Sequence, residues 1–268
     1  MDFQYFMFIE GSLLADYLLI GILVLVFASF VAGFLDAVAG GAGLILVPAF
    51  ILAGMPPQLA LGQEKLISTL GTFSAIYNYF KGAKIVWKVV AYGIPTALIG
   101  AYIGGKVILS IDESIVGQII FFLIPVGLLF SFMPKQDKND GMYQPSQKDI
   151  MIILPLVCFV VGFYDGFFGP GTGSILILAL HFLIHMPLLE SSATSKIFNL
   201  ASNVGAFVAF FIAGKMAFII GMPMILASMS GNYVGSHMTL RNGDKIIKPL
   251  IFVSIAVLFI SLGIRYVW

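Results

Sequence analysis

A glycine-broken apolar segment occurs twice in this chain. Residues 33–56 read GFLDAVAGGAGLILVPAFILAGMP, and residues 162–187 read GFYDGFFGPGTGSILILALHFLIHMP. Both copies run from Gly-Phe-x-Asp through a glycine-rich break and a short apolar stretch to Met-Pro, and the match continues to Lys65 and Lys196. Broken apolar segments at matching positions of two halves are typical of the binding site of a transporter. The sequence therefore predicts two transmembrane repeats with a polar cytoplasmic linker between them: 1–133, 134–148 and 149–268.

Composition indicates that both halves lie in lipid. The chain is 60% apolar and 10% charged with a mean hydropathy of +1.04, whereas a soluble domain is roughly 25% charged. The net charge of +1 gives no information on partners, and because the chain has no basic tract we expect no nucleic-acid partner. Apolar stretches long enough to cross the ~30 Å hydrocarbon core are predicted at 13–35, 89–109, 115–132, 150–168, 216–237 and 246–268.

Each half also contains two stretches that we expect to be short buried helices. Residues 44–54 are too short to span, and residues 66–80 are interleaved with polar side chains. Residues 174–184 and 197–213 repeat this plan. The short helices either form a re-entrant hairpin or both cross, so the prediction is an all-α polytopic fold with about 8–10 transmembrane segments. Either count per half is odd, which makes the two repeats inverted.

The basic residues predict the orientation of this multi-pass protein. With the N-terminus outside, most of them fall on the inner side, as the positive-inside rule requires. The inner set is Lys81, Lys84, Lys88, Lys135, Lys138, Lys148, Arg241, Lys245 and Lys248. The outer set is Lys106, Lys215 and Arg265. The acidic N-terminus lacks the basic start of a signal peptide, so we expect the first helix to be retained.

The two repeat-related lysines are candidate substrate ligands. Lys65 and Lys196 each precede a predicted short polar helix, and Glu64 is the only acid beside either of them in the sequence. Charges inside membranes are costly and usually line a cavity or form a pair. Two inverted copies bring both ammonium groups toward one axis, which predicts a site for a small anion. The alternative is that each lysine extends to the membrane interface.

Polar side chains and glycine breaks extend this candidate site. The predicted polar contacts are Gln63, Ser68, Thr69, Thr72, Thr194, Asn199 and Asn203. The predicted breaks, where free backbone N–H groups at a helix N-terminus attract anions, are Gly40, Gly41 and Gly43 in the first half and Gly171, Thr172 and Gly173 in the second. The structural alternative is that these groups only bond or pack against neighbouring helices.

Three acids complete the candidate set. Asp36 and Asp165 lie deep in the broken segments, and Glu64 precedes Lys65. They either carry protons, pair with the lysines, or stabilise the freed backbone. A remote alternative is an intramembrane aspartyl protease, in which two acids share a proton. The histidines form no metal-ligand pattern, and we expect neither a metal nor another cofactor.

A family resemblance follows from these motifs, which are GFLDAVAGGAG at 33–43, the pattern of Pro56, Lys65, Ser68 and Thr69, and GFYDGFFGPGTG at 162–173. Over nearly its whole length the chain resembles the TauE/SafE family of membrane permeases. That resemblance implies a bacterial or archaeal inner-membrane protein that exports sulfite, sulfoacetate or another sulfur-containing organic anion. Family members often have Asn where this chain has Glu64.

These observations predict a non-enzymatic secondary transporter that moves a small sulfur-containing anion by alternating access. The chain lacks the GxxxxGK[ST] motif of an ATP-binding loop, so a gradient or a separate subunit supplies the energy. An anion channel and a membrane subunit of a larger transport complex are the alternatives. The expected partners are the substrate and the bilayer, and a homodimer is left open.

Overall fold

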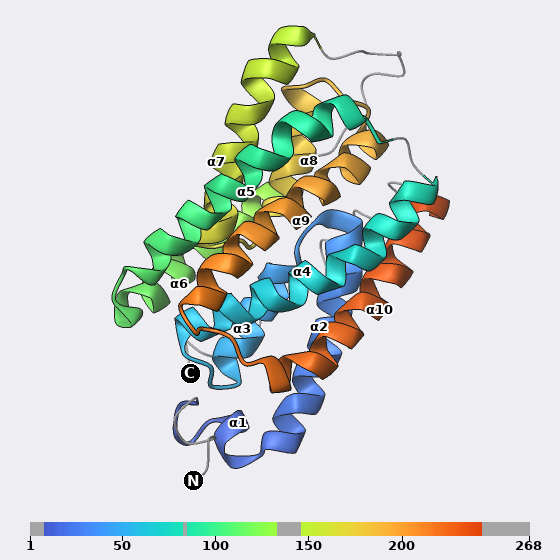
Figure 1. Ribbon diagram of the computed structural model, residues 1–268. Helices are drawn as coiled ribbons and strands as arrows, with labels where there is room; N and C mark the ends of the chain where they lie inside the picture. Colours follow the sequence, from blue (N-terminus) through green and yellow to red (C-terminus); the bar gives the residue numbers. More distant parts are fainter. Residues whose placement is uncertain (1–7, 83–84, 133–145, 243–268) are drawn as a thin grey trace.

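The computed structural model describes residues 8–82, 85–132 and 146–242, and within these ranges the fold contains helices and turns but no strand (Figure 1). The first half contains α1 (Leu13–Asp16), α2 (Leu18–Ala39), α3 (Ala42–Leu52), α4 (Pro57–Gly82), α5 (Trp87–Leu109) and α6 (Glu113–Phe132). The second half contains the π-helical turn η1 (Asp149–Ile153), α7 (Leu154–Phe167), α8 (Thr172–Phe182), α9 (Leu188–Ile212) and α10 (Phe218–Asn242).

Five helical stretches in the described part are long and apolar enough to cross a membrane. They are Leu18–Val38, Trp87–Leu109, Asp149–Phe167, Glu190–Ile212 and Phe218–Arg241. Large apolar side chains such as Ile219, which is 90% exposed, lie on the outer surface of the bundle, as expected for a face that contacts lipid. The all-α multi-pass class is confirmed. The span predicted at 246–268 lies outside the described residues.

Two short buried helices were predicted in each half, and the second of them is longer than expected. α4 begins at Pro57 rather than near residue 66, and α9 begins at Leu188 rather than at residue 197. A proline fits the first helical position because its missing N–H would have no partner there. The expectation of short helices at 66–80 and 197–213 is therefore wrong, and both lysines lie inside long helices. α3 and α8, with 11 residues each, are short as predicted.

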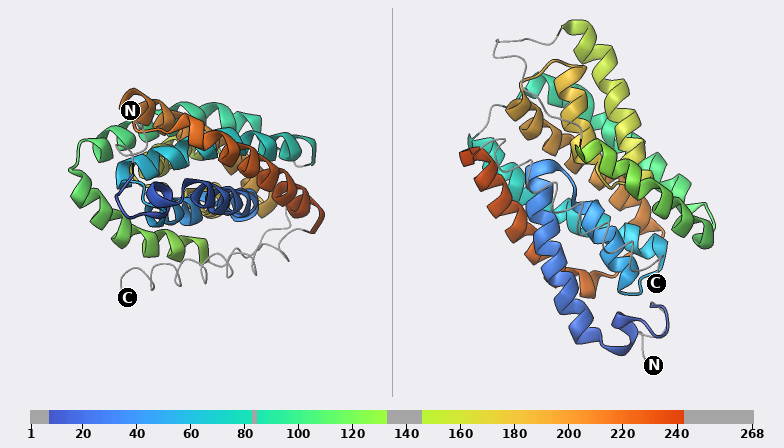
Figure 2. Two further views of the ribbon diagram at one scale, coloured as in Figure 1. Left: turned by 90° about the horizontal axis from the view of Figure 1, so that it is seen from below. Right: turned by 180° about the vertical axis from the view of Figure 1, so that it is seen from behind.

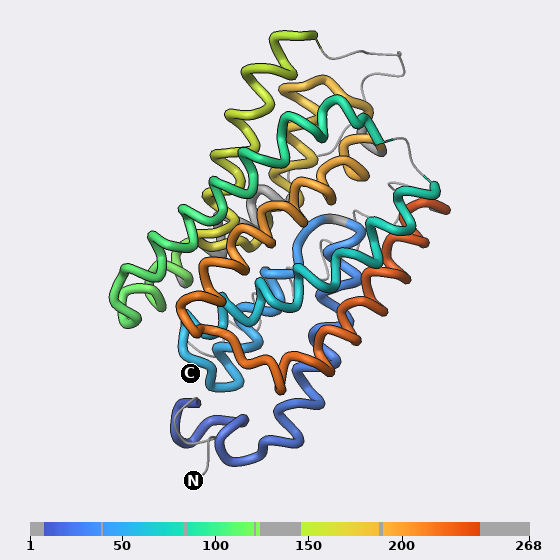
Figure 3. Tube along the Cα trace, viewed as in Figure 1, coloured from blue at the N-terminus to red at the C-terminus, as the bar shows by residue number. Residues whose placement is uncertain are grey.

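One long helix of each half packs against the other half in an equivalent way. α5 packs along α7 and α10 packs along α2, as the tube view also shows (Figure 3). Gly104 of α5 lies against the carbonyl group of Phe163, and Gly235 of α10 lies against that of Phe34. A Cβ atom at either glycine would collide with this backbone. Glycine at these positions therefore allows the close approach of the two helices in each pair.

The direction of the helices agrees with an inverted relation between the halves. In Figure 1, α2 runs from the end of the molecule that carries the N-terminus toward the opposite end, whereas its counterpart α7 runs the other way. The view from behind in Figure 2 shows the same arrangement. Inversion of the two halves relative to the bilayer stays a prediction.

Candidate functional site

Two helix breaks, one from each half, meet inside the bundle. Gly40 caps α2 with a φ of 76°, and Gly171 precedes α8 with a φ of 86°. Both angles lie in the left-handed region that favours glycine. An added Cβ at Gly40 would collide with the backbone of Gly173, so only a residue without a side chain allows this close approach. The N-termini of α3 and α8 consequently lie next to each other.

Lys65 of α4 sits at the centre of the first charged cluster. Its Nζ lies 2.8 Å from Asp165 Oδ1 and 3.0 Å from Glu64 Oε2, and it donates to Asn203 Oδ1 at 3.4 Å. The side chain is only 1% exposed. The ammonium group thus donates hydrogen bonds to acceptors on α7 and α9 and forms an ion pair with Glu64 on its own helix, which joins the two halves.

Both acids of this cluster have further donors. Asp165 Oδ1 accepts from Thr172 at 3.0 Å, and Asp165 Oδ2 accepts from the Ser202 hydroxyl. Glu64 Oε1 accepts from Ser68 at 2.7 Å. Hydrogen bonds to an ionised carboxylate stabilise its charged form. Asp165 is therefore the better satisfied of the two carboxylates.

The second charged pair repeats the first across the duplication. Lys196 of α9 lies 3.2 Å from Asp36 Oδ2 and also donates to the backbone oxygen of Asp36 on α2. Lys196 and Lys65 are equivalent in the repeat, as are Asp36 and Asp165. Each lysine thus pairs with the acid of the other half, as one of the alternatives for the aspartates predicted. Neither buried lysine extends to a membrane interface, so that alternative is wrong.

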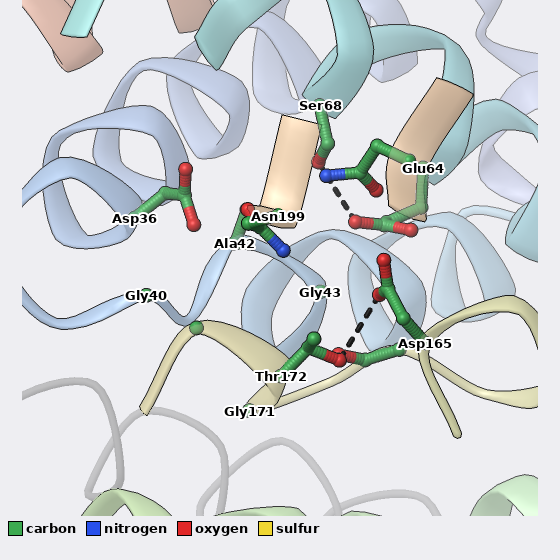
Figure 4. A pocket seen from close by; sticks show the side chains of 13 residues that line it. Asp36, Gly40, Ala42, Gly43, Glu64, Ser68, Asp165, Gly171, Thr172 and Asn199 are labelled. Atoms are coloured by element: carbon green, nitrogen blue, oxygen red, sulfur yellow. Dashed lines mark hydrogen bonds between the residues drawn. The ribbon is translucent and has the colours of Figure 1, made fainter. Parts of the chain in front are cut away.

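Thirteen residues from both halves line a polar cavity between these clusters (Figure 4). The cavity is narrow: its free space is about 10 Å³, room for about one water molecule, within about 210 Å³ of empty space that includes the part open to the outside. The predicted site residues that line it are Asp36, Gly40, Gly43, Glu64, Ser68, Asp165, Gly171, Thr172, Gly173, Asn199 and Asn203. Ala42 and Gly169 also line the cavity and were not among the predicted contacts, although their place inside the two glycine-rich breaks was an available signal.

The remaining predicted site residues do not line this cavity: Gly41, Gln63, Lys65, Thr69, Thr72, Thr194 and Lys196. Gln63 bonds both to the backbone N–H of Ala217, at 3.0 Å, and to its carbonyl oxygen, which anchors α4 to the segment before α10. Thr72 donates to the carbonyl of Ser68 at 2.7 Å. Gln63 and Thr72 therefore bond to the protein backbone, as the structural alternative predicted.

The charge balance of the site differs from the one expected. Two lysines and three carboxylates lie together, so the fully ionised cluster carries one excess negative charge. The expectation of two lysines without acidic partners other than Glu64 is wrong, because the broken segments bring Asp36 and Asp165 to them. Positive potential at the cavity comes instead from the helix N-termini of α3 and α8.

The geometry gives no support to the aspartyl protease alternative. In the described network, Asp36 is held by Lys196 and Asp165 by Lys65, and neither acid bonds to the other. Figure 4 shows Asp36 on one side of the cavity, with Asp165 and Glu64 together on the other. A catalytic pair must instead share a proton between adjacent carboxyl groups.

The fold and site together define a polytopic helical membrane protein with a charged interior cavity between two repeats. The chain matches the family described as "Sulfite exporter TauE/SafE" over residues 25–262 and belongs to that family. It is 36% identical to a probable membrane transporter protein of Haemophilus influenzae over 225 residues, which cover 84% of this chain and 87% of that protein.

Two further relatives have similar names. The probable membrane transporter protein ORF9 of a Sinorhizobium species is 37% identical, with 85% of this chain and 87% of that protein covered. The probable membrane transporter protein YfcA of Escherichia coli K12 is 33% identical, with 88% and 87% covered. No solved structure matches the chain. Family and relatives indicate a membrane transporter, in keeping with a protein that is not an enzyme.

Proposed function

We propose that this chain is a secondary transporter of the cytoplasmic membrane that binds one small sulfur-containing oxyanion, such as sulfite or sulfoacetate, in the cavity between α3 and α8. The observation that carries the proposal is the meeting of two helix N-termini, one from each half, at a polar cavity. The family description supports the choice of a sulfur anion.

The donors around the cavity suit an oxyanion with several oxygens. The first N–H groups of a helix have no partner within that helix, and here the first turns of α3 and α8 line the cavity. The side-chain amides of Asn199 and Asn203 add donors from α9. The lysines contribute indirectly, because each one compensates the carboxylate beside it. The anion is thus bound by neutral dipoles rather than by free ammonium groups.

Alternating access is the proposed transport mechanism. The cavity lies where contacts between the two halves cross, with α4 and α9 packed against each other and both ion pairs joining the halves. Rocking of one part against the other would open this cavity to each side in turn.

The position of basic residues supports an outside N-terminus. In Figure 1, α4 and α10 end, and α5 and α7 begin, toward one end of the molecule, and these helix ends carry Lys81, Lys88 and Arg241. α2 begins at the opposite end. Under the positive-inside rule, the basic end faces the cytoplasm.

Anion binding to the purified protein in detergent tests the proposed substrate class. We expect one of sulfite, sulfoacetate, taurine and sulfate to bind, and Asn199→Ala to weaken that binding about tenfold or more, because a hydrogen bond to a charged group contributes about 1.5–3 kcal/mol. Calorimetric titration measures both affinities.

The matched control is Asn232→Ala, which removes a buried asparagine that bonds within α10 and does not line the cavity. We expect its affinity to equal that of the wild type. Equal losses in both variants would argue against the cavity as the site, and no binding of any of these anions would refute the substrate class. Transport that is not stimulated by substrate on the opposite side of the membrane would instead favour a channel.

A further inference from the structure

The duplication leaves one acid of the charged network without a counterpart. Lys65 and Asp165 correspond to Lys196 and Asp36, and these four residues form two neutral pairs. Glu64 corresponds to Ser195 in the second half, a neutral side chain that donates to the carbonyl of Ser192. Glu64 therefore carries the excess negative charge of an otherwise balanced arrangement, and it lines the cavity.

We infer that Glu64 binds one proton together with the transported anion, so that the chain is a proton–anion cotransporter. The inference rests on the proposed function, since it requires an anion in the cavity between α3 and α8. It adds the coupling ion and the residue that carries it.

The contacts favour Glu64 over its neighbours as the proton site. Lys65 is shared between Asp165 and Glu64, so it can neutralise only one of them. Asp165 has two hydroxyl donors besides the lysine, whereas Glu64 has one, from Ser68. Asp36 has Lys196 to itself. Protonation of Glu64 therefore sacrifices less stabilisation than protonation of Asp165 and leaves the second pair intact.

The anion supplies the reason for coupling. Glu64 is almost fully buried, and burying uncompensated charge is costly. An anion placed beside three carboxylates and two lysines raises the excess to two or more negative charges. A proton on Glu64 removes one of them and converts a repelling oxygen into an O–H donor.

The charged groups facing Glu64 are few and defined. Lys65 comes from α4 and Asp165 from α7, and across the cavity lies the pair of Asp36 on α2 and Lys196 on α9. α3 and α8 contribute no titratable side chain to the lining. Among these groups only Asp165 could take the coupled proton while leaving Lys65 in a neutral pair, and two hydroxyl donors already stabilise its ionised form.

The test is the pH dependence of anion affinity. Sulfoacetate binding is measured from about pH 6 to pH 8, where both acidic groups of the ligand stay ionised; sulfate serves as the second probe. We expect the affinity of the wild-type protein to fall by up to about tenfold per pH unit where free Glu64 is ionised, because one proton must then be taken up per anion. In Glu64→Gln, which imitates the protonated acid, the affinity should be independent of pH.

The control is Glu113→Gln, which removes a half-exposed acid paired with Lys215 and should retain the wild-type slope. Titration of the wild-type protein at pH 8 in two buffers of different ionisation enthalpy counts protons directly, should Glu64→Gln fail to fold. About one proton per anion is expected. Anion binding without proton uptake, or an unchanged slope in Glu64→Gln, overturns the inference and leaves the proposed function standing. No binding of either probe, nor of sulfite or taurine, at any pH overturns both.

Discussion

Replacing Lys65 with methionine is expected to destabilise the protein by about 3–5 kcal/mol, because it leaves Asp165 and Glu64 buried without a cation. Lys196→Met should have a similar effect through Asp36. Thermal unfolding of the purified protein in detergent measures both. The matched control is Lys106→Met, at an exposed position of α5, where little change is expected.

The double variant Asp36→Asn with Lys196→Met distinguishes the effect of leaving a charge unpaired from the effect of changing the shape of the side chain. Removing both partners of a buried pair is often nearly neutral, whereas removing one leaves an unpaired charge. We expect the double variant to recover most of the stability lost in Lys196→Met. If the two substitutions were simply additive, Asp36 and Lys196 would not be the coupled pair that the geometry shows.

Adding one methyl group at the crossing of α5 and α7 is the second large expected effect. Gly104→Ala should destabilise the protein by about 1–3 kcal/mol, because the new Cβ meets the carbonyl of Phe163. Gly235→Ala, its repeat counterpart, should destabilise the protein by a similar amount, because the new Cβ meets the carbonyl of Phe34. Thermal unfolding in detergent again provides the measurement.

The control for this prediction is Gly117→Ala on α6, where the nearest atom to a new Cβ is the ring of Pro57 at 3.5 Å. That is an ordinary contact, so the better helix propensity of alanine should make this variant neutral or more stable by up to about 1 kcal/mol. Equal behaviour of all three glycine variants would contradict the close packing of the repeats.

The broken helices were predictable from the sequence because their cause is local. Gly40 and Gly171 adopt left-handed angles, and glycines clustered in an apolar run signal such a break. The lysine and aspartate positions were predictable from the duplication. The start of α4 at Pro57 was not, because proline ends one helix and begins another equally well, and only tertiary burial of residues such as Gln63 decides the matter.

The pairing of lysines with aspartates was left open by the sequence. Asp36 and Lys196 lie in different halves, and the repeats could have brought each lysine to the acid of its own half. The packing of α4 against α9 at the boundary between the halves accompanies the crossed pairing, and such tertiary packing is not encoded in either repeat alone. Residue type alone also does not separate ligand contacts from structural ones: Thr72 bonds the backbone of its own helix and Gln63 that of Ala217, whereas Asn199 lines the cavity.

A structure of the protein with a bound anion tests the central claim most directly. Sulfate or sulfoacetate is added, whichever the titrations show to bind, and the density in the bundle is examined. We expect the anion between the first turns of α3 and α8, within hydrogen-bond distance of the N–H groups near Gly43 and Gly173 and of the Asn199 amide. An anion bound elsewhere, with this cavity empty, would contradict the assignment of the meeting helix breaks as the substrate site.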